Sequence, residues 1–112
     1  MSQITTHVLD SALGKPAANV PVSLSQCDDQ GHWSTLNGTV TNEDGRAPAL
    51  GPDKLPAGTY RLRFETATYL KQQGQPVFYP YVEVVFSIDD SGTHYHIPLL
   101  MSPFSYSTYR GS

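Results

Sequence analysis

Short runs of apolar and β-branched residues alternate with turn-forming segments along most of the chain. An alternation of apolar and polar positions predicts half-buried β-strands. Five such runs cover residues 4–9, 20–26, 33–40, 59–65 and 81–88. Turn signals separate them, including the Asp-Gly pair of TNEDGR, because these residues tolerate the backbone angles of tight turns. These five runs therefore predict an all-β unit.

The rest of the chain adds one interruption and two further strands to this pattern. The segment ATYLKQQG (67–74) is compatible with one or two helical turns that end at Gly74. DDSG (89–92) predicts a hairpin turn, THYHIPLLM (93–101) a penultimate strand and FSYSTYRGS (104–112) a last one. We expect seven or eight strands in one antiparallel sandwich or barrel, which forms a single domain over residues 1–112.

The alternation assigns faces in the first and penultimate strands, since successive side chains point to opposite faces. The positions expected to face the core are Ile4, Thr6, Val8, Tyr95, Ile97, Leu99 and Met101. The opposite face carries Thr5, His7, Leu9, His94, His96, Pro98 and Leu100. Two histidines, His7 and His96, are therefore predicted to point away from the core.

This outer face also carries the apolar residues Leu9 and Leu100. A strand that is apolar on both faces is usually covered on both faces. In a chain of 112 residues, a second subunit is the simplest cover. A sheet face used as an interface would then enclose His7 and His96 in a shared cavity.

Composition narrows the functional classes. The net charge of −3 without a Lys/Arg cluster argues against nucleic-acid binding, and no apolar run reaches membrane-spanning length. Charged residues make up only 15% of the chain, which also favours self-association. The single cysteine, Cys27, excludes an internal disulfide. The start MSQITTHVLD lacks signal-peptide features and the end is not a peroxisomal address, so we expect a cytoplasmic protein, or a periplasmic one if the chain is a processed form.

Three side chains are the main candidates for chemistry. His7 and His96 suit general acid–base catalysis because histidine titrates near neutral pH; the alternative is two surface histidines. His94 and His96 form a His-x-His pair that, with His7, suits a zinc site. Arg46 follows a tight turn and can present its planar donors to an anion or a carbonyl oxygen, or be an ordinary surface arginine. We interpret Cys27 as structural, since its neighbours are acidic.

Three separated motifs, TTHVLD, NEDGR and HYHIPLLMSPFSYSTYRGS, resemble the transthyretin-like 5-hydroxyisourate hydrolases. The resemblance continues through GKPAANVPV and LPAGTYRLRF and so covers the whole chain. It implies a transthyretin-like (prealbumin-like) β-sandwich of two four-stranded antiparallel sheets with one short helix. It also implies a homotetramer, a dimer of dimers, with active sites in a channel at the dimer–dimer interface.

The resemblance further implies a function in urate catabolism: the hydrolytic ring opening of 5-hydroxyisourate to 2-oxo-4-hydroxy-4-carboxy-5-ureidoimidazoline, with no cofactor or metal. The family's catalytic positions fall on His7, Arg46, His96 and Ser112. The substrate-binding positions are these four and the rest of the closing tetrapeptide, Tyr109, Arg110 and Gly111. Three rival classes are a carrier of small ligands with the same fold, a β-sandwich interaction module and a metalloenzyme on the histidine cluster.

Overall fold

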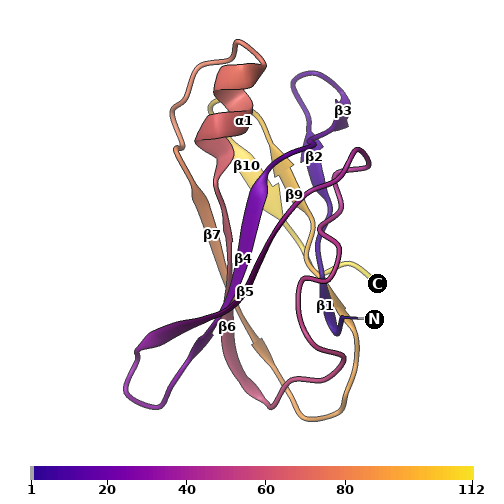
Figure 1. The fold of residues 1–112 in the computed structure, drawn as a ribbon, viewed down its shortest axis with the longest axis vertical. Coiled ribbons are helices and arrows are strands. Elements are labelled where there is room, and N and C mark those ends of the chain that lie inside the picture. The colour runs from indigo at the N-terminus through magenta and orange to yellow at the C-terminus, as the bar shows by residue number, and fades with distance from the viewer. Residues whose placement is uncertain (1) are drawn as a thin grey trace.

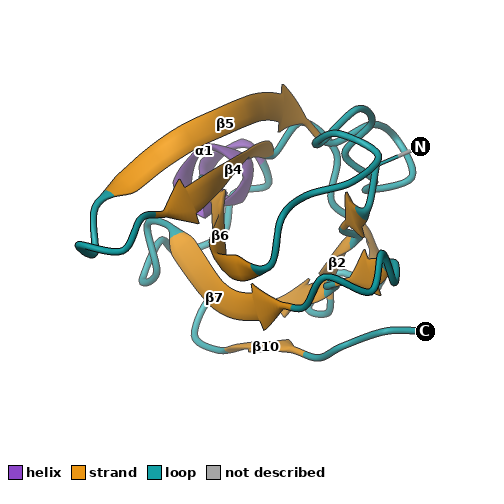
Figure 2. Cartoon of the chain, turned by 90° about the horizontal axis from the view of Figure 1, so that it is seen from below, coloured by secondary structure: helices purple, strands orange, loops and turns teal. Residues whose placement is uncertain are grey.

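Two four-stranded sheets face each other in the computed structural model, which describes residues 2–112 (Figures 1 and 2). One sheet has the strand order β5-β4-β6-β7 and is antiparallel throughout. Its strands are β4 (Pro21–Cys27), β5 (Trp33–Val40), β6 (Gly58–Phe64) and β7 (Val82–Ile88). The predicted strand over 33–40 is confirmed, and the other three predictions are within one or two residues of these bounds.

The second sheet has the order β10-β9-β2-β3. Its strands are β2 (Val8–Asp10), β3 (Lys15–Pro16), β9 (Leu99–Met101) and β10 (Tyr106–Thr108). A separate two-stranded sheet joins β1 (Ile4–Thr5) to β8 (Tyr95–His96). The helix α1 (Thr66–Gln72) leads to Gly74, which has a φ of +68°, a conformation that favours glycine. The predicted sandwich of two four-stranded sheets with one short helix is confirmed.

Three expectations about the strands are wrong. The first and penultimate strands are each divided, into β1 and β2 and into β8 and β9. Pro98 lies at the second break and has no N–H to donate to a ladder. The β1–β8 and β2–β9 pairs are parallel, so the sandwich is not antiparallel throughout. DDSG does not close a hairpin, because β7 and β8 belong to different sheets.

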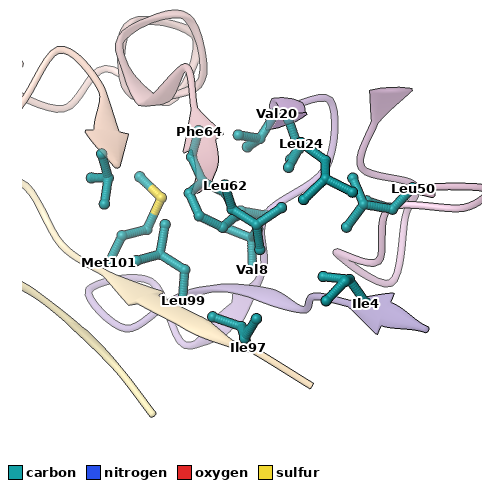
Figure 3. Packing of buried hydrophobic residues seen from close by; sticks show 14 of the residues in the cluster. Ile4, Val8, Val20, Leu24, Leu50, Leu62, Phe64, Ile97, Leu99 and Met101 are labelled. Atoms are coloured by element: carbon teal, nitrogen blue, oxygen red, sulfur yellow. The ribbon is translucent and has the colours of Figure 1, made fainter. Parts of the chain in front are cut away.

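The core lies between the two sheets, and the alternation assigned its residues correctly (Figure 3). All seven predicted core positions on the first and penultimate strands are buried. They pack against apolar residues of the other sheet, among them Leu24, Leu62 and Phe64. Each fully buried side chain of this size contributes about 1.5–3 kcal/mol. This core fixes the first and penultimate strands side by side, with His7 and His96 on the outside.

A buried carboxylate attaches α1 to the second sheet. Asp10 is buried and accepts hydrogen bonds from the Tyr69 hydroxyl at 2.8 Å and the Gln75 amide at 3.1 Å. It also accepts from the backbone N–H groups of Ala12 and Leu13. Burial acts to raise the pKa of Asp10, but these hydrogen bonds together hold it below its ordinary value.

We predict that Tyr69→Phe destabilises the protein by about 1.5–3 kcal/mol, because the buried carboxylate of Asp10 loses a donor. The free energy of unfolding, measured with urea, checks this. Equal midpoints and slopes for the variant and the parent protein would contradict the structural role given to this hydrogen bond.

Candidate active site

A cavity of about 650 Å³ opens on the outside of the sandwich, where β1, β8, the turn at 42–46 and the C-terminal residues meet. Its polar lining comes from segments far apart in sequence. The polar and charged lining residues are Ser2, Thr5, Thr6, Asn42, Arg46, His94, His96 and Ser112. The N- and C-terminal ends of the chain lie on the same side of the molecule (Figure 1). The cavity therefore brings together Arg46, His96 and Ser112, three of the four predicted catalytic residues.

His96 lines this cavity from β8 and is partly buried. The pKa of His96 is held below its ordinary value. Burial is the largest cause, because it disfavours the charged imidazole, and the positive charge of Arg46 is the next. His94 and His7 act in the same direction when they are protonated. The neutral ring of His96, which can accept a proton, is thus favoured near neutral pH.

His7 lies between β1 and β2, beside the turn that carries Arg46. Its backbone forms an isolated antiparallel bridge with Arg46. The His7 Nε2 atom is 2.7 Å from the carbonyl oxygen of Asp44. A carbonyl oxygen only accepts hydrogen bonds, so Nε2 carries a proton and the neutral ring has its lone pair on Nδ1. The structure thus places the His7 side chain beside the Arg46 turn and fixes its tautomer.

The turn NEDGR is what fixes Arg46. The side chain of Asn42 accepts hydrogen bonds from the backbone N–H groups of Asp44 and Arg46, and the N–H of Asn42 donates to the Arg46 carbonyl. Gly45 has a φ of +78°, and a Cβ there would lie 2.3 Å from the carbonyl oxygen of Val8. Only glycine allows this approach. The sequence motif therefore fixes the backbone position from which the Arg46 side chain extends.

The end of the chain reaches the same site. The backbone N–H of Gly111 donates to the carbonyl of His96 at 2.7 Å, and these two residues form an antiparallel bridge. A Cβ on Gly111 would lie 2.7 Å from Cδ2 of the His96 ring. Ser112 follows and lines the cavity. The last strand, β10, pairs with β9, and the chain continues from it to the bridge with His96.

Tyr109 and Arg110 lie elsewhere in this single chain. Both line a second hollow, between β7 and β10, with Tyr95 and Ile97. The guanidinium of Arg110 lies 4.5 Å from the centre of the Tyr95 ring, a cation–π contact. Arg110 thus secures the tail that carries Gly111 to His96. That either residue contacts substrate stays a prediction.

One polar residue of the cavity, Thr5, has contacts that the sequence analysis did not foresee. The Thr5 hydroxyl lies within hydrogen-bond distance of both His94 and His96. The parity of the first strand put Thr5 on the face of His7, and that was the only signal available. His32 is on the surface, with its ring 3.7 Å from the carboxylate of Asp28, and Cys27 is a free, partly buried thiol.

Two further observations bear on the rival classes. Within residues 2–112, no group of three histidine, cysteine or carboxylate side chains is placed to hold a metal ion. Over the same residues, no helix has the length and apolar character needed to cross a membrane. The metalloenzyme hypothesis is tested directly by measuring activity in the presence of a chelator.

Comparison with known proteins supports the family resemblance that the sequence motifs indicate. Residues 4–111 match the model of the HIUase/Transthyretin family. A 5-hydroxyisourate hydrolase of Mus musculus is 50% identical to this chain over 113 residues, which cover 99% of this chain and 96% of the mouse protein. The structure of the Klebsiella pneumoniae 5-hydroxyisourate hydrolase superposes with a TM-score of 0.85 and 38% identity, and each chain is covered completely.

The fold is shared with proteins of a different name. Sea bream transthyretin, solved in complex with thyroxine, superposes with a TM-score of 0.92 and 35% identity, over 97% of this chain and 94% of that one. The similarity of fold therefore extends to both enzyme and binding protein. With a family model that matches almost the entire chain and relatives of about half identical sequence over nearly full length, the chain belongs to the HIUase/Transthyretin family.

Proposed function

We infer that this protein is an enzyme, a 5-hydroxyisourate hydrolase that acts in urate degradation. The observation that carries this inference is the 50% identity to the mouse enzyme over nearly the whole chain. The cavity supports it with His96, Arg46 and Ser112 in its lining, because hydrolysis needs a base for water and donors for the oxyanion. A carrier of small apolar ligands has no need of this polar set.

We assign the general base to His96. Its lowered pKa keeps the ring neutral near pH 7, and it lines the cavity directly. His96 takes a proton from a water molecule as the water oxygen attacks a ring carbonyl of the substrate. The ring C–N bond then breaks, and the leaving nitrogen receives the proton that His96 took from the water, which returns His96 to its neutral form. His7 lies on the neighbouring segment between β1 and β2, and its Nε2 is hydrogen-bonded to the Asp44 carbonyl. We assign it the role of orienting the water.

Arg46 binds the substrate oxygens and stabilises the negative charge that grows on the attacked carbonyl. Its backbone is fixed by the Asn42 side chain, so little reorganisation is needed when the charge develops. Ser112, on the cavity wall, orders the site by hydrogen bonding to substrate or histidine. Tyr109 closes the pocket as an aromatic wall in the assembled protein.

The assembly that we propose is a homotetramer, a dimer of dimers. Leu9 and Leu100 lie opposite each other in the β2–β9 pair, on the outer face beside the cavity, and both are only partly buried in the single chain. Covering this face with a second copy buries them and shields the cavity from bulk water. Shielding strengthens the electrostatic interactions of Arg46.

The test is the ultraviolet decay of 5-hydroxyisourate generated from urate by urate oxidase. We expect this protein to accelerate the decay above the spontaneous rate, and activity to persist in chelator. No acceleration from a correctly assembled tetramer would overturn the proposal. In that case a thyroxine titration would test whether the cavity serves a carrier.

We predict that Arg46→Gln lowers kcat/KM and moves the acid limb of the pH profile upward. The positive charge of Arg46 lowers the pKa of His96. Removing that charge raises the pKa toward the ordinary value of about 6.5, so His96 becomes protonated, and inactive as a base, at a higher pH. A kcat/KM profile from about pH 5 to 8 measures the midpoint.

Arg46→Lys is the matched control for this experiment. It keeps the positive charge near His96 and loses the planar fork of donors. We therefore expect a lower kcat/KM with the parent midpoint. An acid limb that stays in place in Arg46→Gln would show that a group other than His96 controls it.

A further inference from the structure

The hydroxyl of Thr5 lies between two imidazoles. Its Oγ1 is 2.8 Å from Nδ1 of His96 and 2.9 Å from Nε2 of His94. The β1–β8 pairing places Thr5 directly opposite His96, and His94 lies two residues earlier on the same face. All three residues line the cavity. Thr5 is therefore the one residue shown here to join the two histidines of the His-x-His pair.

A hydroxyl group has a single proton, so Thr5 can donate to only one of the two neutral rings, and two arrangements use that proton within the triad. In the first, Thr5 donates to His96 Nδ1, so the proton of His96 is on Nε2 and that atom cannot act as a base. In the second, His96 Nδ1–H donates to Thr5, and Thr5 donates to His94 Nε2. Only the second arrangement leaves the lone pair of His96 Nε2 available.

We propose that Thr5 is a positioning residue that, by donating its hydroxyl proton to His94, keeps the proton of neutral His96 on Nδ1 and leaves Nε2 free to accept one. The proposal rests on the assignment of His96 as general base. It gives His94 a role as well, as the acceptor at the end of the chain of hydrogen bonds. When Nε2 takes a proton from water, the Nδ1–H bond to Thr5 is retained, so no group has to rotate.

The surroundings of His96 favour this arrangement. The Thr5 backbone acts to raise the pKa of His96, as an acceptor beside a ring N–H does. The titratable and charged groups that act on His96 are Arg46 from the turn after β5, His94 from the approach to β8, and His7 from between β1 and β2. None of them is an anion that would draw the Nδ1 proton away from Thr5.

The first test measures the tautomer directly. Nitrogen-15 NMR of the histidine rings distinguishes a protonated from an unprotonated Nδ1 in neutral imidazole. We expect His96 to carry its proton on Nδ1 in the parent protein and in Thr5→Ser. Thr5→Val and His94→Phe, which remove the hydroxyl and its acceptor, should shift His96 toward the Nε2–H form. A parent protein with His96 protonated on Nε2 would overturn the proposal.

The second test is kinetic. We expect Thr5→Val to lower kcat at least about 10-fold with little change in KM, because a base in the wrong tautomer loses up to about 10⁴-fold. Thr5→Ser should restore most of the activity and keep the parent pH profile. Thr35→Val, the same substitution at an exposed position of β5, is the matched control and should change nothing. Full activity in Thr5→Val, with the parent melting temperature, would contradict the role of the hydroxyl.

The two tests separate this proposal from the proposed function. If the parent protein fails to hydrolyse 5-hydroxyisourate, the function is wrong, and the NMR measurement still decides whether Thr5 sets the tautomer of His96. If the parent protein is active and His96 is protonated on Nε2, the function stands and the role of Thr5 is wrong.

Discussion

Replacing His96 by alanine is expected to lower kcat about 10²–10⁴-fold, the usual contribution of a general base. The variant removes a histidine of the cavity whose pKa is lowered by its surroundings. We expect the effect in kcat, and not in KM, because the base acts on water in the transition state and contributes less to substrate binding. We also expect His7→Ala to lower kcat, since the water loses its second contact.

The fold should survive the change to alanine. The His96 side chain is on the outer face of β8, while the core side of that strand is formed by its neighbours Tyr95 and Ile97. Sizing chromatography and the melting temperature test this, and the 5-hydroxyisourate decay assay measures kcat. His32→Ala, at an exposed loop histidine far from the cavity, is the matched control and should keep parent activity. Near-parent turnover in His96→Ala would show that another group activates the water.

The alternation of side chains predicted more of the fold than the turn signals did. It placed Ile4, Val8 and Leu99 in the core and His7 and His96 outside it, because a strand packed on one side reveals its faces directly in the sequence. The partners of the strands were not predicted well. DDSG has the composition of a hairpin turn, yet the chain crosses there from one sheet to the other. A short turn sequence does not determine which strands pair, since pairing depends on how the whole core packs.

The same limit explains which site residues the sequence revealed. Arg46 was identified because its position depends on a local turn, and Gly45 and Asn42 fix that turn within five residues. Thr5 was not identified, because its contact with His96 spans 91 positions along the chain. That contact depends on the parallel pairing of β1 with β8, which the alternation does not show. Local chemistry was therefore predictable, and the hydrogen bonds between distant strands were not.

Gly111→Ala is expected to lower kcat about 10²-fold, although it adds a single methyl group at the end of the chain. That methyl carbon would lie 2.7 Å from Cδ2 and 3.3 Å from Cγ of the His96 ring, distances that are too short for carbon atoms in contact. The ring cannot simply turn away, because Thr5 holds its Nδ1 at 2.8 Å. A displacement of about 1 Å at a catalytic group is enough for a loss of this size.

The alternative response is that the tail moves instead of the ring. The hydrogen bond from the Gly111 N–H to the His96 carbonyl would then break, and Ser112 would leave the cavity wall. Both responses disturb the site and leave the core intact, so the free energy of unfolding should change by less than about 1 kcal/mol. Gly38→Ala is the matched control, since a Cβ there meets its nearest atom at 4.0 Å.

The comparison of these two glycines separates a steric effect on His96 from a general effect of glycine replacement. Gly38→Ala adds the same methyl group within a strand and should keep kcat unchanged, with a small gain or loss in stability. If Gly111→Ala also keeps kcat, then His96 tolerates displacement and the tail has no positioning role. If it loses kcat while its histidine NMR shifts show a moved His96 ring, the glycine of the closing tetrapeptide is there to leave room for the general base.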